Sequence, residues 1–435
     1  MEWRAGLLLF PQPAVRVEVF AKTQFMRASP KPTPRPAAAA TPSPLDEPSD
    51  FSVVPEGPYF LMIRRAHLCG NAMELVPRRI VLLTLVAWLP LLVLSLLSGR
   101  AWGDAVTVPF LRDISVHVRF LVALPLLILA EVVVHQRMRP IVHQFLARGL
   151  IRDTSRARFE AAVASALRLR RSAVMEVLLV AVVYLVGVRY FWPQYGALNV
   201  PTWYGAPAGG GRQLFPAGRW FLYVSLPFFQ FVILRWYFRL FIWARFLWQA
   251  ARCELALIPT HPDRAGGLGF LAGGVIAFSP FLAAHGALLA GSIANQIFFR
   301  GVELPAFENE LIAVVGFLLV VMLGPLVPFT PHLALARRVG LREYGNLAHR
   351  YVRQFDAKWI RGGATAGERL LGSSDIQSLA DIGNSYGIVQ SMRIVAFSRD
   401  TIFRLVAATL LPVAPLILTM MPLKTLVTEL VKIVV

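Results

Sequence analysis

The sequence has little cysteine and little charge for its 435 residues. Its two cysteines, Cys69 and Cys253, lie far apart beside basic segments, so they form neither a disulfide framework nor a metal-ligand pair. We expect both thiols to be reduced and to face the cytoplasm. Charged residues make up 16% of the chain, whereas a soluble domain carries about 25%. This low fraction argues against a soluble globular protein.

The familiar motifs of catalysis and cofactor binding are also missing. The chain has no P-loop, no nucleophile elbow, no H-E-x-x-H and no paired-cysteine motif. We therefore predict no cofactor, no bound metal and no catalytic residue, and we favour a protein that is not an enzyme.

Basic residues outnumber acidic ones by 44 to 25, which gives a formal net charge of +19. Almost all of the excess is arginine, and it alternates along the chain with apolar runs. That alternation is typical of membrane topology and of contacts with anionic lipid headgroups, not of a nucleic-acid surface. The predicted partners are the lipid bilayer and anionic headgroups, with no nucleic acid.

Apolar surface is what the chain has in abundance, since 56% of its residues are hydrophobic and its mean hydropathy is +0.57. A membrane-spanning helix needs about 20 mostly apolar residues, and seven segments suit such a helix. They are Ile80–Ser98, Ile114–Val134, Ala173–Trp192, Trp220–Leu234, Ala265–Phe299, Leu311–Ala336 and Leu405–Leu423. The predicted fold class is all-α: a polytopic transmembrane helical bundle of about seven spans, with a small helical cytoplasmic subdomain.

The connections between these segments differ in charge. Those after the second, fourth and sixth segments are rich in arginine, and the others are poor in it. Because positive charge resists translocation, the rich connections are expected in the cytoplasm. This predicts a multi-pass protein of a bacterial inner membrane with its amino terminus in the cytoplasm and its carboxyl terminus outside. Lys424 and Lys432 are exceptions, because they are positive charges in a tail that this topology places outside.

Composition divides the chain into four parts. Residues 1–75 form a Pro/Ala-rich segment without apolar periodicity, for which we expect no fold. The segment is either a tether or upstream sequence included by a misplaced translation start. Whether residues 1–58 belong to the mature protein is left open. Residues 76–336 hold spans one to six, residues 337–403 form the cytoplasmic subdomain, and residues 404–435 hold the seventh span and an interfacial helix.

The subdomain is expected to contain two helices. Apolar residues recur at helical spacing over Leu341–Ile360, and Ser374 and Asp375 form an N-cap region for a second helix. We expect these helices to form a small domain or to lie on the membrane surface, where a cytoplasmic partner could bind.

The stretch from Pro259 to Phe270 joins clustered polar residues to glycines just before the fifth apolar segment. The residues singled out are His261, Asp263, Arg264, Gly266 and Gly267. Glycines allow close backbone approach, and the N-terminus of the following helix suits an anion. The alternative is a tight turn that caps this helix, with Asp263 as acceptor and Arg264 facing lipid phosphate.

Ionisable residues inside apolar segments are functional candidates, because burying them in lipid is costly. Here they are His117, Arg119, Glu131, Glu176 and His285. All except His285 lie near enough to an interface to reach water or to pair with nearby arginines. A proton or metal site of Glu131, His135 and Glu176 is a minor alternative.

Four arginines, at positions 235, 239, 245 and 252, alternate with tryptophans after the fourth segment. Their spacing does not fit a voltage sensor, so an interfacial aromatic and basic helix is predicted.

The fifth segment has 35 residues without a formal charge, whereas a span needs about 20. A straight helix of that length would reach roughly 50 Å. We therefore predict a break near Gly273, Gly274 and Pro280, together with a polar cavity that reaches His285.

Several stretches resemble a family of uncharacterised bacterial multi-pass inner-membrane proteins. They are Val108–Asp113 with His117–Pro125, Thr260–Phe270 and Ser378–Tyr386. The resemblance covers roughly residue 60 onward and implies localisation but no activity.

These observations favour a channel or transporter for a small solute or ion. Its pathway would run beside the fifth and sixth spans, with His285 inside it and the turn over His261–Gly269 at its cytoplasmic mouth. A second hypothesis is a non-transporting sensor or assembly protein that binds a cytoplasmic partner through residues 337–403. A third is a membrane-embedded lipid-modifying enzyme that uses His261 and Asp263. Self-association into a homo-oligomer is open.

Overall fold

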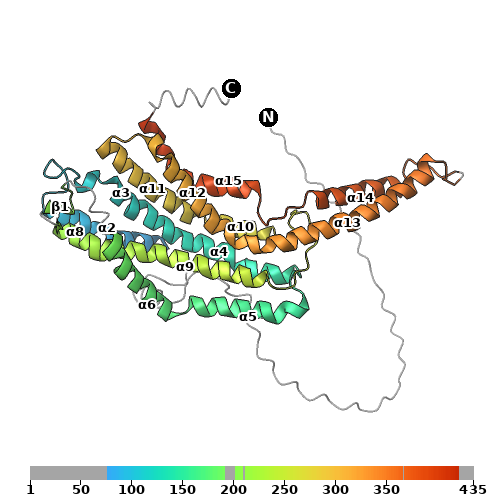
Figure 1. The fold of residues 1–435 in the computed structure, drawn as a ribbon, viewed down its shortest axis with the longest axis horizontal. Helices are drawn as coiled ribbons and strands as arrows, with labels where there is room; N and C mark the ends of the chain where they lie inside the picture. The colour runs from blue at the N-terminus through green and yellow to red at the C-terminus, as the bar shows by residue number, and fades with distance from the viewer. Residues whose placement is uncertain (1–75, 192–200, 209–210, 366, 421–435) are drawn as a thin grey trace, which may run out of the picture. The chain divides into compact units, whose positions relative to one another are not determined.

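The computed structural model describes residues 76–191, 201–208, 211–365 and 367–420, and these are mostly helical (Figure 1). In chain order, with η for 3-10 and π-helical segments, the elements are α2 (Val76–Leu97), η1 (Phe110–Arg112), α3 (Ile114–His117), η2 (Val118–Ala123), α4 (Leu124–Ala147), α5 (Asp153–Arg170), α6 (Ala173–Val182), η3 (Val183–Phe191), β1 (Gly205–Ala208), β2 (Gly211–Leu214), α8 (Pro216–Trp220), η4 (Phe221–Ser225), α9 (Leu226–Ala250), α10 (Phe270–Ile276), α11 (Ser279–Arg300), η5 (Leu304–Phe307), α12 (Glu308–Leu323), η6 (Gly324–Phe329), α13 (Thr330–Phe355), η7 (Asp356–Ile360), α14 (Ser374–Gln390), α15 (Arg399–Leu410) and η8 (Ala414–Thr419). The two short strands pair antiparallel, an addition that the apolar pattern did not predict. The predicted segment 1–75 lies outside the described residues.

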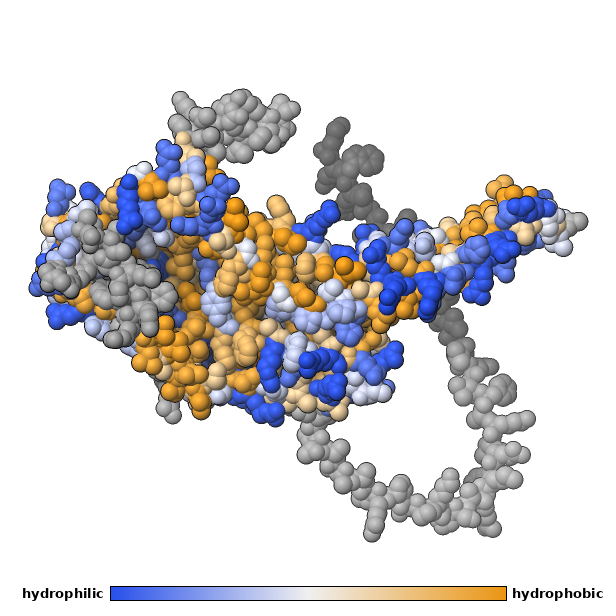
Figure 2. All heavy atoms as spheres, viewed as in Figure 1, coloured by the Kyte–Doolittle hydropathy of each residue, from blue (hydrophilic) through white to orange (hydrophobic). Residues whose placement is uncertain are grey.

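Five helices are long and apolar enough to cross a membrane. They are Val76–Leu97, Ile114–Ala147, Pro216–Ala250, Phe270–Arg300 and Leu304–Ile360. They coincide with the first, second, fourth, fifth and sixth apolar segments, which confirms the mostly helical class and these five elements. Leu97 at the end of α2 is 80% exposed, and hydrophobic residues cover the middle of the bundle on the face shown in Figure 2. Such a surface needs an apolar surrounding.

The third and seventh segments are shorter helices. The third contains the apolar helix Ala173–Gly187, and η3 continues the helical run to Phe191. In the seventh, α15 ends at Leu410, and η8 follows after Pro412. Proline lacks the backbone N–H and clashes with the preceding turn, so Pro412 and Pro415 account for the end of the helix. The count of seven spans therefore stays a prediction.

The predicted interruption of the fifth segment is confirmed. α10 ends at Ile276 and α11 begins at Ser279, with Ala277 and Phe278 in a turn between them. Pro280 lies in the first turn of α11, where its missing N–H costs nothing and its ring prevents continuation from α10. Gly274 has a different role, because a Cβ there would lie 2.6 Å from Ile141 Cδ1 of α4.

Two long helices begin with a π-helical segment. In η2 the Leu124 N–H bonds the Arg119 carbonyl, and in η4 the Leu226 N–H bonds the Phe221 carbonyl. A proline follows directly in both cases, at the start of α4 and of α9. Its ring clashes with the carbonyl four residues earlier, and the wider turn relieves this. Arg119 is thereby held in an irregular turn of a candidate span.

The chain beyond α12 forms a helical hairpin. α13 continues through Ala336 and Arg337 without a break, and α14 packs against it (Figure 1). The Lys358 ammonium and the Trp359 indole N–H both donate to Asp375 Oδ2 at 2.9 Å. The helices predicted over Leu341–Ile360 and from Ser374 are therefore confirmed. Asp375 lies in the first turn of α14, and its carboxylate accepts these hydrogen bonds from η7, the segment that continues α13.

Candidate functional site

The polar turn between α9 and α10 needs unusual backbone conformations. Arg264, Gly266 and Gly267 have φ angles of 55°, 62° and 99°. A Cβ on Gly266 would also lie 3.2 Å from both Leu257 and Met392, a tight contact that adds to the preference of this φ angle for glycine. The sequence therefore places two glycines where the chain makes a tight turn against neighbouring side chains.

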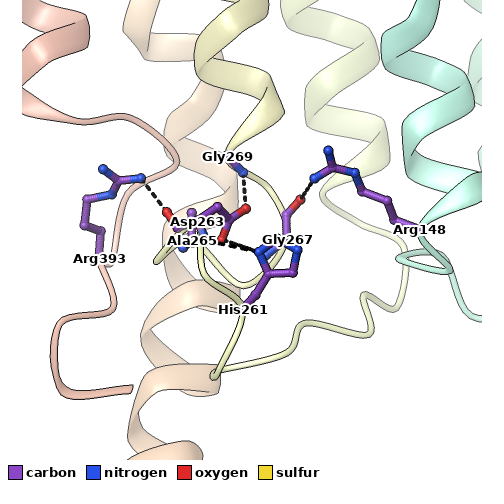
Figure 3. A network of polar contacts seen from close by, with 7 residues as sticks. All are labelled: Arg148, His261, Asp263, Ala265, Gly267, Gly269 and Arg393. Carbon is purple, nitrogen blue, oxygen red and sulfur yellow. Dashed lines mark hydrogen bonds and ion pairs between the residues drawn. The ribbon is translucent and has the colours of Figure 1, made fainter. Parts of the chain in front are cut away.

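The Asp263 carboxylate fills the turn (Figure 3). Its Oδ1 accepts from the backbone N–H groups of Ala265 at 2.8 Å and Gly267 at 3.2 Å, and its Oδ2 accepts from Gly269 at 2.8 Å. These are the donors that an external anion would use at the start of α10. Asp263 therefore takes the place of a bound anion, which favours the capping interpretation of this turn.

The environment of Asp263 stabilises its ionised form. Burial raises the pKa of this carboxyl, but the backbone N–H groups of Ala265, Gly269 and Gly267, together with nearby His261, outweigh burial and lower the pKa below its ordinary value. His261 Nδ1 lies 2.9 Å from Asp263 Oδ1 and 3.2 Å from the Asp263 backbone nitrogen. The pair is part of one folded turn.

The turn also joins distant parts of the chain. Arg393, which follows α14, donates from Nη2 to the Asp263 carbonyl at 2.9 Å and from its backbone nitrogen to the Arg264 carbonyl at 2.8 Å. Arg148, at the end of α4, donates to the Gly267 carbonyl at 3.1 Å (Figure 3). The Arg264 side chain is exposed. The turn connects α4, α10 and the segment after α14.

A buried cluster of charges lies among α2, α4, α6 and α9. Glu131 Oε1 accepts from Arg239 Nη2 at 2.6 Å and lies 3.9 Å from Arg235 Nη1, and Arg79 forms an ion pair with Glu131 Oε2. Arg235 Nη2 is 3.5 Å from Glu176. The side chains of Arg79, Arg235 and Glu131 are each 8% exposed, and that of Arg239 is 4% exposed.

This cluster changes the interpretation of its members. Arg235 and Arg239 are buried ion-pair partners, so the prediction of an interfacial basic helix is wrong for these two positions. Glu131 and Glu176 are held by arginines, as the pairing alternative expected. In the described part of the chain, no group of three or more His, Cys, Asp or Glu side chains could hold a metal ion.

His285 lies on α11 and is oriented by two hydrogen bonds. Its Nδ1 is 2.9 Å from the Phe281 carbonyl oxygen; because a carbonyl only accepts, Nδ1 carries the proton. Its Nε2 lies 3.0 Å from the Tyr237 hydroxyl of α9. In the neutral ring Nε2 accepts, so Tyr237 donates.

A cavity of about 830 Å³ lies beside this pair, between α9, α11 and η3. Its polar lining residues are Ser115, Arg119, Gln230, Tyr237, His285 and Ser292. The rest of the lining is glycine or apolar, mainly valine and leucine. The sequence predicted a polar cavity at His285; a cavity does reach His285, but most of its wall is apolar.

The cavity is separate from the other two features. Among the described residues that line it, none belongs to the helix break at 277–278 or to the turn at 261–269. The sequence predicted a cavity at the helix break with its mouth at the turn, and the structure supports neither placement. Irregular backbone does reach the cavity, but at Arg119 of η2 and along η3.

Two cavity residues have close surroundings. Arg119 is 7% exposed, and its guanidinium carbon lies 5.9 Å and 6.0 Å from the ring centroids of Phe221 and Phe229. Gln230 Oε1 is buried without a hydrogen-bond partner in the described part of the chain. A Cβ on Gly187 would lie 2.3 Å from this oxygen, so a larger residue there would require the Gln230 side chain to move.

A further polar site near the start of α3 was missed in the sequence. Asp113 is 5% exposed and accepts from Trp203 Nε1 at 2.9 Å, Asn295 Nδ2 at 2.8 Å and the Val116 backbone at 3.3 Å. An aspartate just before an apolar helix is an N-cap signal that could have identified it. His117 accepts from Trp88 Nε1 at 3.0 Å and thus has a structural partner.

In comparisons with known proteins, this chain matches no protein-family model, no curated protein and no solved structure.

Proposed function

We propose that this chain is a multi-pass membrane protein that binds a small solute in the cavity beside His285 and moves it across the bilayer. The observation that carries the proposal is the cavity itself, about 830 Å³ in volume. Sites for small molecules are typically roughly 300–1,000 Å³, mostly apolar, with a few convergent polar groups. Six polar side chains on η2, α9, α11 and the adjoining α3 supply such groups.

Two further observations support a binding role for the cavity. The buried Gln230 oxygen has an unused acceptor position among the described residues, and a buried polar atom normally has a partner. Arg119 and His285 both lie within candidate spans, where ionisable residues are costly and usually functional.

The other two polar features have supporting roles in this proposal. The Glu131 cluster neighbours the cavity along α9, because Arg235 and Arg239 flank Tyr237 of the lining, and its ion pairs join α9 to α2 and α4. The turn at Asp263 anchors α10 and α4. Because its carboxylate already accepts three backbone bonds, we do not propose lipid chemistry at His261 and Asp263.

The proposed topology keeps seven spans in a bacterial inner membrane, with the amino terminus and residues 337–403 in the cytoplasm and the carboxyl terminus outside. It rests on the alternation of arginine between the connections. Reporter fusions after Arg171 and Arg361 should give a cytoplasmic signal, and fusions after Gly210 and Val435 an external one. An external signal at Arg361 would contradict this arrangement.

Solute flux into liposomes that contain the purified full chain tests the function. Ser292 lines the cavity and is exposed, so Ser292→Trp should fill the cavity without displacing core residues. We expect flux of the transported solute to fall at least about tenfold in this variant. Val320→Trp is the control, because Val320 is 70% exposed and does not line the cavity. Equal flux in both variants would exclude the cavity as the pathway.

The second candidate is an assembly protein whose α13–α14 hairpin binds a partner. It is favoured by apolar residues near the end of the hairpin, since Ile360 is 70% and Leu371 is 87% exposed. A non-transporting assembly protein should show no solute flux, and Ile360→Ser together with Leu371→Ser should abolish its stable complex with a cytoplasmic partner. Loss of flux without loss of the partner would favour transport.

A further inference from the structure

Among the described residues that line the cavity, Arg119 is the only one with a formal charge. Arg119 lines the cavity and is 7% exposed, and no Asp or Glu is among the described residues of the lining. The hydrogen bonds of His285 to Phe281 and Tyr237 are satisfied by a neutral ring. A guanidinium in an apolar surrounding interacts much more strongly with an anion than it would in water. The cavity therefore favours a negative ligand group over a cation.

The remaining wall suits an apolar body. Apart from one glycine, the valines, leucines, isoleucine and phenylalanine of η3, α9, α11 and their neighbours make up the rest of the lining. They offer no hydrogen bonds from their side chains, so a sugar or another polyhydroxylated solute would lose its own hydration without compensation. An acyl chain would instead bury apolar surface, which is favourable for each methylene removed from water.

The rim of the cavity indicates where a ligand enters. Val182 and Val186 are 36% and 42% exposed, and Ser292 is also exposed, whereas Val183 and Leu226 deeper in the wall are buried. These three rim residues lie on the sides of apolar helices, while Ser115 of the lining lies at the start of the candidate span Ile114–Ala147. A ligand with an apolar chain reaches such an opening directly from the bilayer.

We propose that the cavity binds an amphipathic monoanion, with its charged group at Arg119 and its apolar chain along the wall formed by η3 and α9. The proposal rests on the proposed function for the membrane setting and specifies the class of solute. Fatty-acid carboxylates and anionic phospholipids share this chemistry.

Calorimetric titration of the purified full chain, in a detergent with an uncharged headgroup, tests the ligand class. Decanoate is the probe, and decanol and decyltrimethylammonium are uncharged and cationic ligands of the same chain length. We expect decanoate to bind at least about tenfold more tightly than either, as a charge-assisted contact predicts. Arg119→Gln should remove that preference, and Arg119→Lys should keep part of it. Equal affinities for decanoate and decanol would overturn the proposal.

Two further variants separate folding defects from loss of the site. Arg112→Gln is the matched control, because Arg112 is a nearby arginine with an exposed side chain that does not line the cavity, and it should leave decanoate binding unchanged. Ser292→Trp should weaken decanoate and decanol alike by filling the cavity. Unchanged decanoate binding in both Arg119→Gln and Ser292→Trp would overturn the proposal even if either variant lost thermal stability.

Nanodiscs distinguish the sources of the ligand and separate this proposal from transport. Competition of phosphatidylglycerol with decanoate would assign the site to a lipid headgroup, and decanoate binding without such competition would assign it to a free carboxylate. Decanoate that binds but is not moved into liposomes would support the ligand class and contradict transport. Flux of another solute that is blocked by Ser292→Trp, without decanoate binding, would support transport and overturn the ligand class.

Discussion

Gly286 of α11 lies directly against the backbone of Thr409 in α15. A Cβ on Gly286 would be 1.9 Å from the Thr409 carbonyl oxygen and 3.4 Å from Pro412 Cδ. Helices that approach this closely need a residue without a side chain at the contact. The position of α15 on α11 therefore depends on one glycine.

Gly286→Ala should destabilise the protein, because the added methyl group must push α15 away from α11. We expect a loss of at least about 1–3 kcal/mol, the usual cost of overpacking. Thermal unfolding of the purified protein measures it. Gly316→Ala is the control, because a Cβ on Gly316 of α12 meets nothing within 4 Å. Equal melting temperatures for the two variants would contradict the close approach.

Glu131→Gln should be strongly destabilising, since it leaves buried arginines without their negative partner. Removing one member of a buried ion pair typically costs about 3–5 kcal/mol. Glu160→Gln removes a carboxylate from a partly exposed i,i+4 pair with Arg156 and should cost at most about 0.5 kcal/mol. A comparison of the two melting temperatures tests whether Glu131 is a buried ion-pair partner. Equal melting temperatures for the Glu131 and Glu160 variants would contradict it.

Asp263→Asn should weaken the turn before α10, because the amide NH₂ faces backbone N–H donors that the carboxylate accepted. Loss of a helix cap costs about 0.5–2 kcal/mol. The folded-state pKa of Asp263 lies below its ordinary value. Its contribution to stability is therefore complete above about pH 4 and is lost as the pH falls through the lowered pKa. Melting temperatures from neutral pH downward should show a smaller acid-dependent loss in the variant than in the wild type.

Cys253 should react slowly with maleimides in the folded protein. The residue is 1% exposed, and burial raises the pKa of its thiol despite the opposing charge of Arg158, so little thiolate is available. In a Cys69→Ala background, labelling should become fast only after denaturation. Arg156→Cys provides an exposed control, because the Arg156 side chain is 57% exposed. Rapid labelling of native Cys253 would show that the segment after α9 opens.

Hydropathy predicted the helices well because it is a local property of each segment. Five apolar segments became long helices, and the excess length of the fifth predicted its break. In the seventh, Pro412 separates α15 from the 3-10 helix η8, a local cue that average hydropathy conceals.

Polar partners could not be predicted in the same way. Arg239 and Glu131 are 108 residues apart in the chain, and nothing in their neighbourhoods identifies one as the partner of the other. The turn at Asp263 was recognised from its glycines, but its geometry decided that its own carboxylate, and not a ligand, takes the N–H groups. The cavity depends on how α9, α11 and η3 pack, so His285 could be singled out while Tyr237 and Gln230 could not.

The charge cluster sets an order of events during synthesis. A charged residue at the centre of a helix opposes insertion into a bilayer by about 2.5–3.5 kcal/mol. When Glu131 leaves the ribosome, Arg79 has already been made, whereas Arg239 follows 108 residues later. At about 5–20 residues per second, that delay is roughly 5–20 s. Arg79 is therefore the first partner that α4 can find, and the arrival of α9 completes the neutralisation of Glu131.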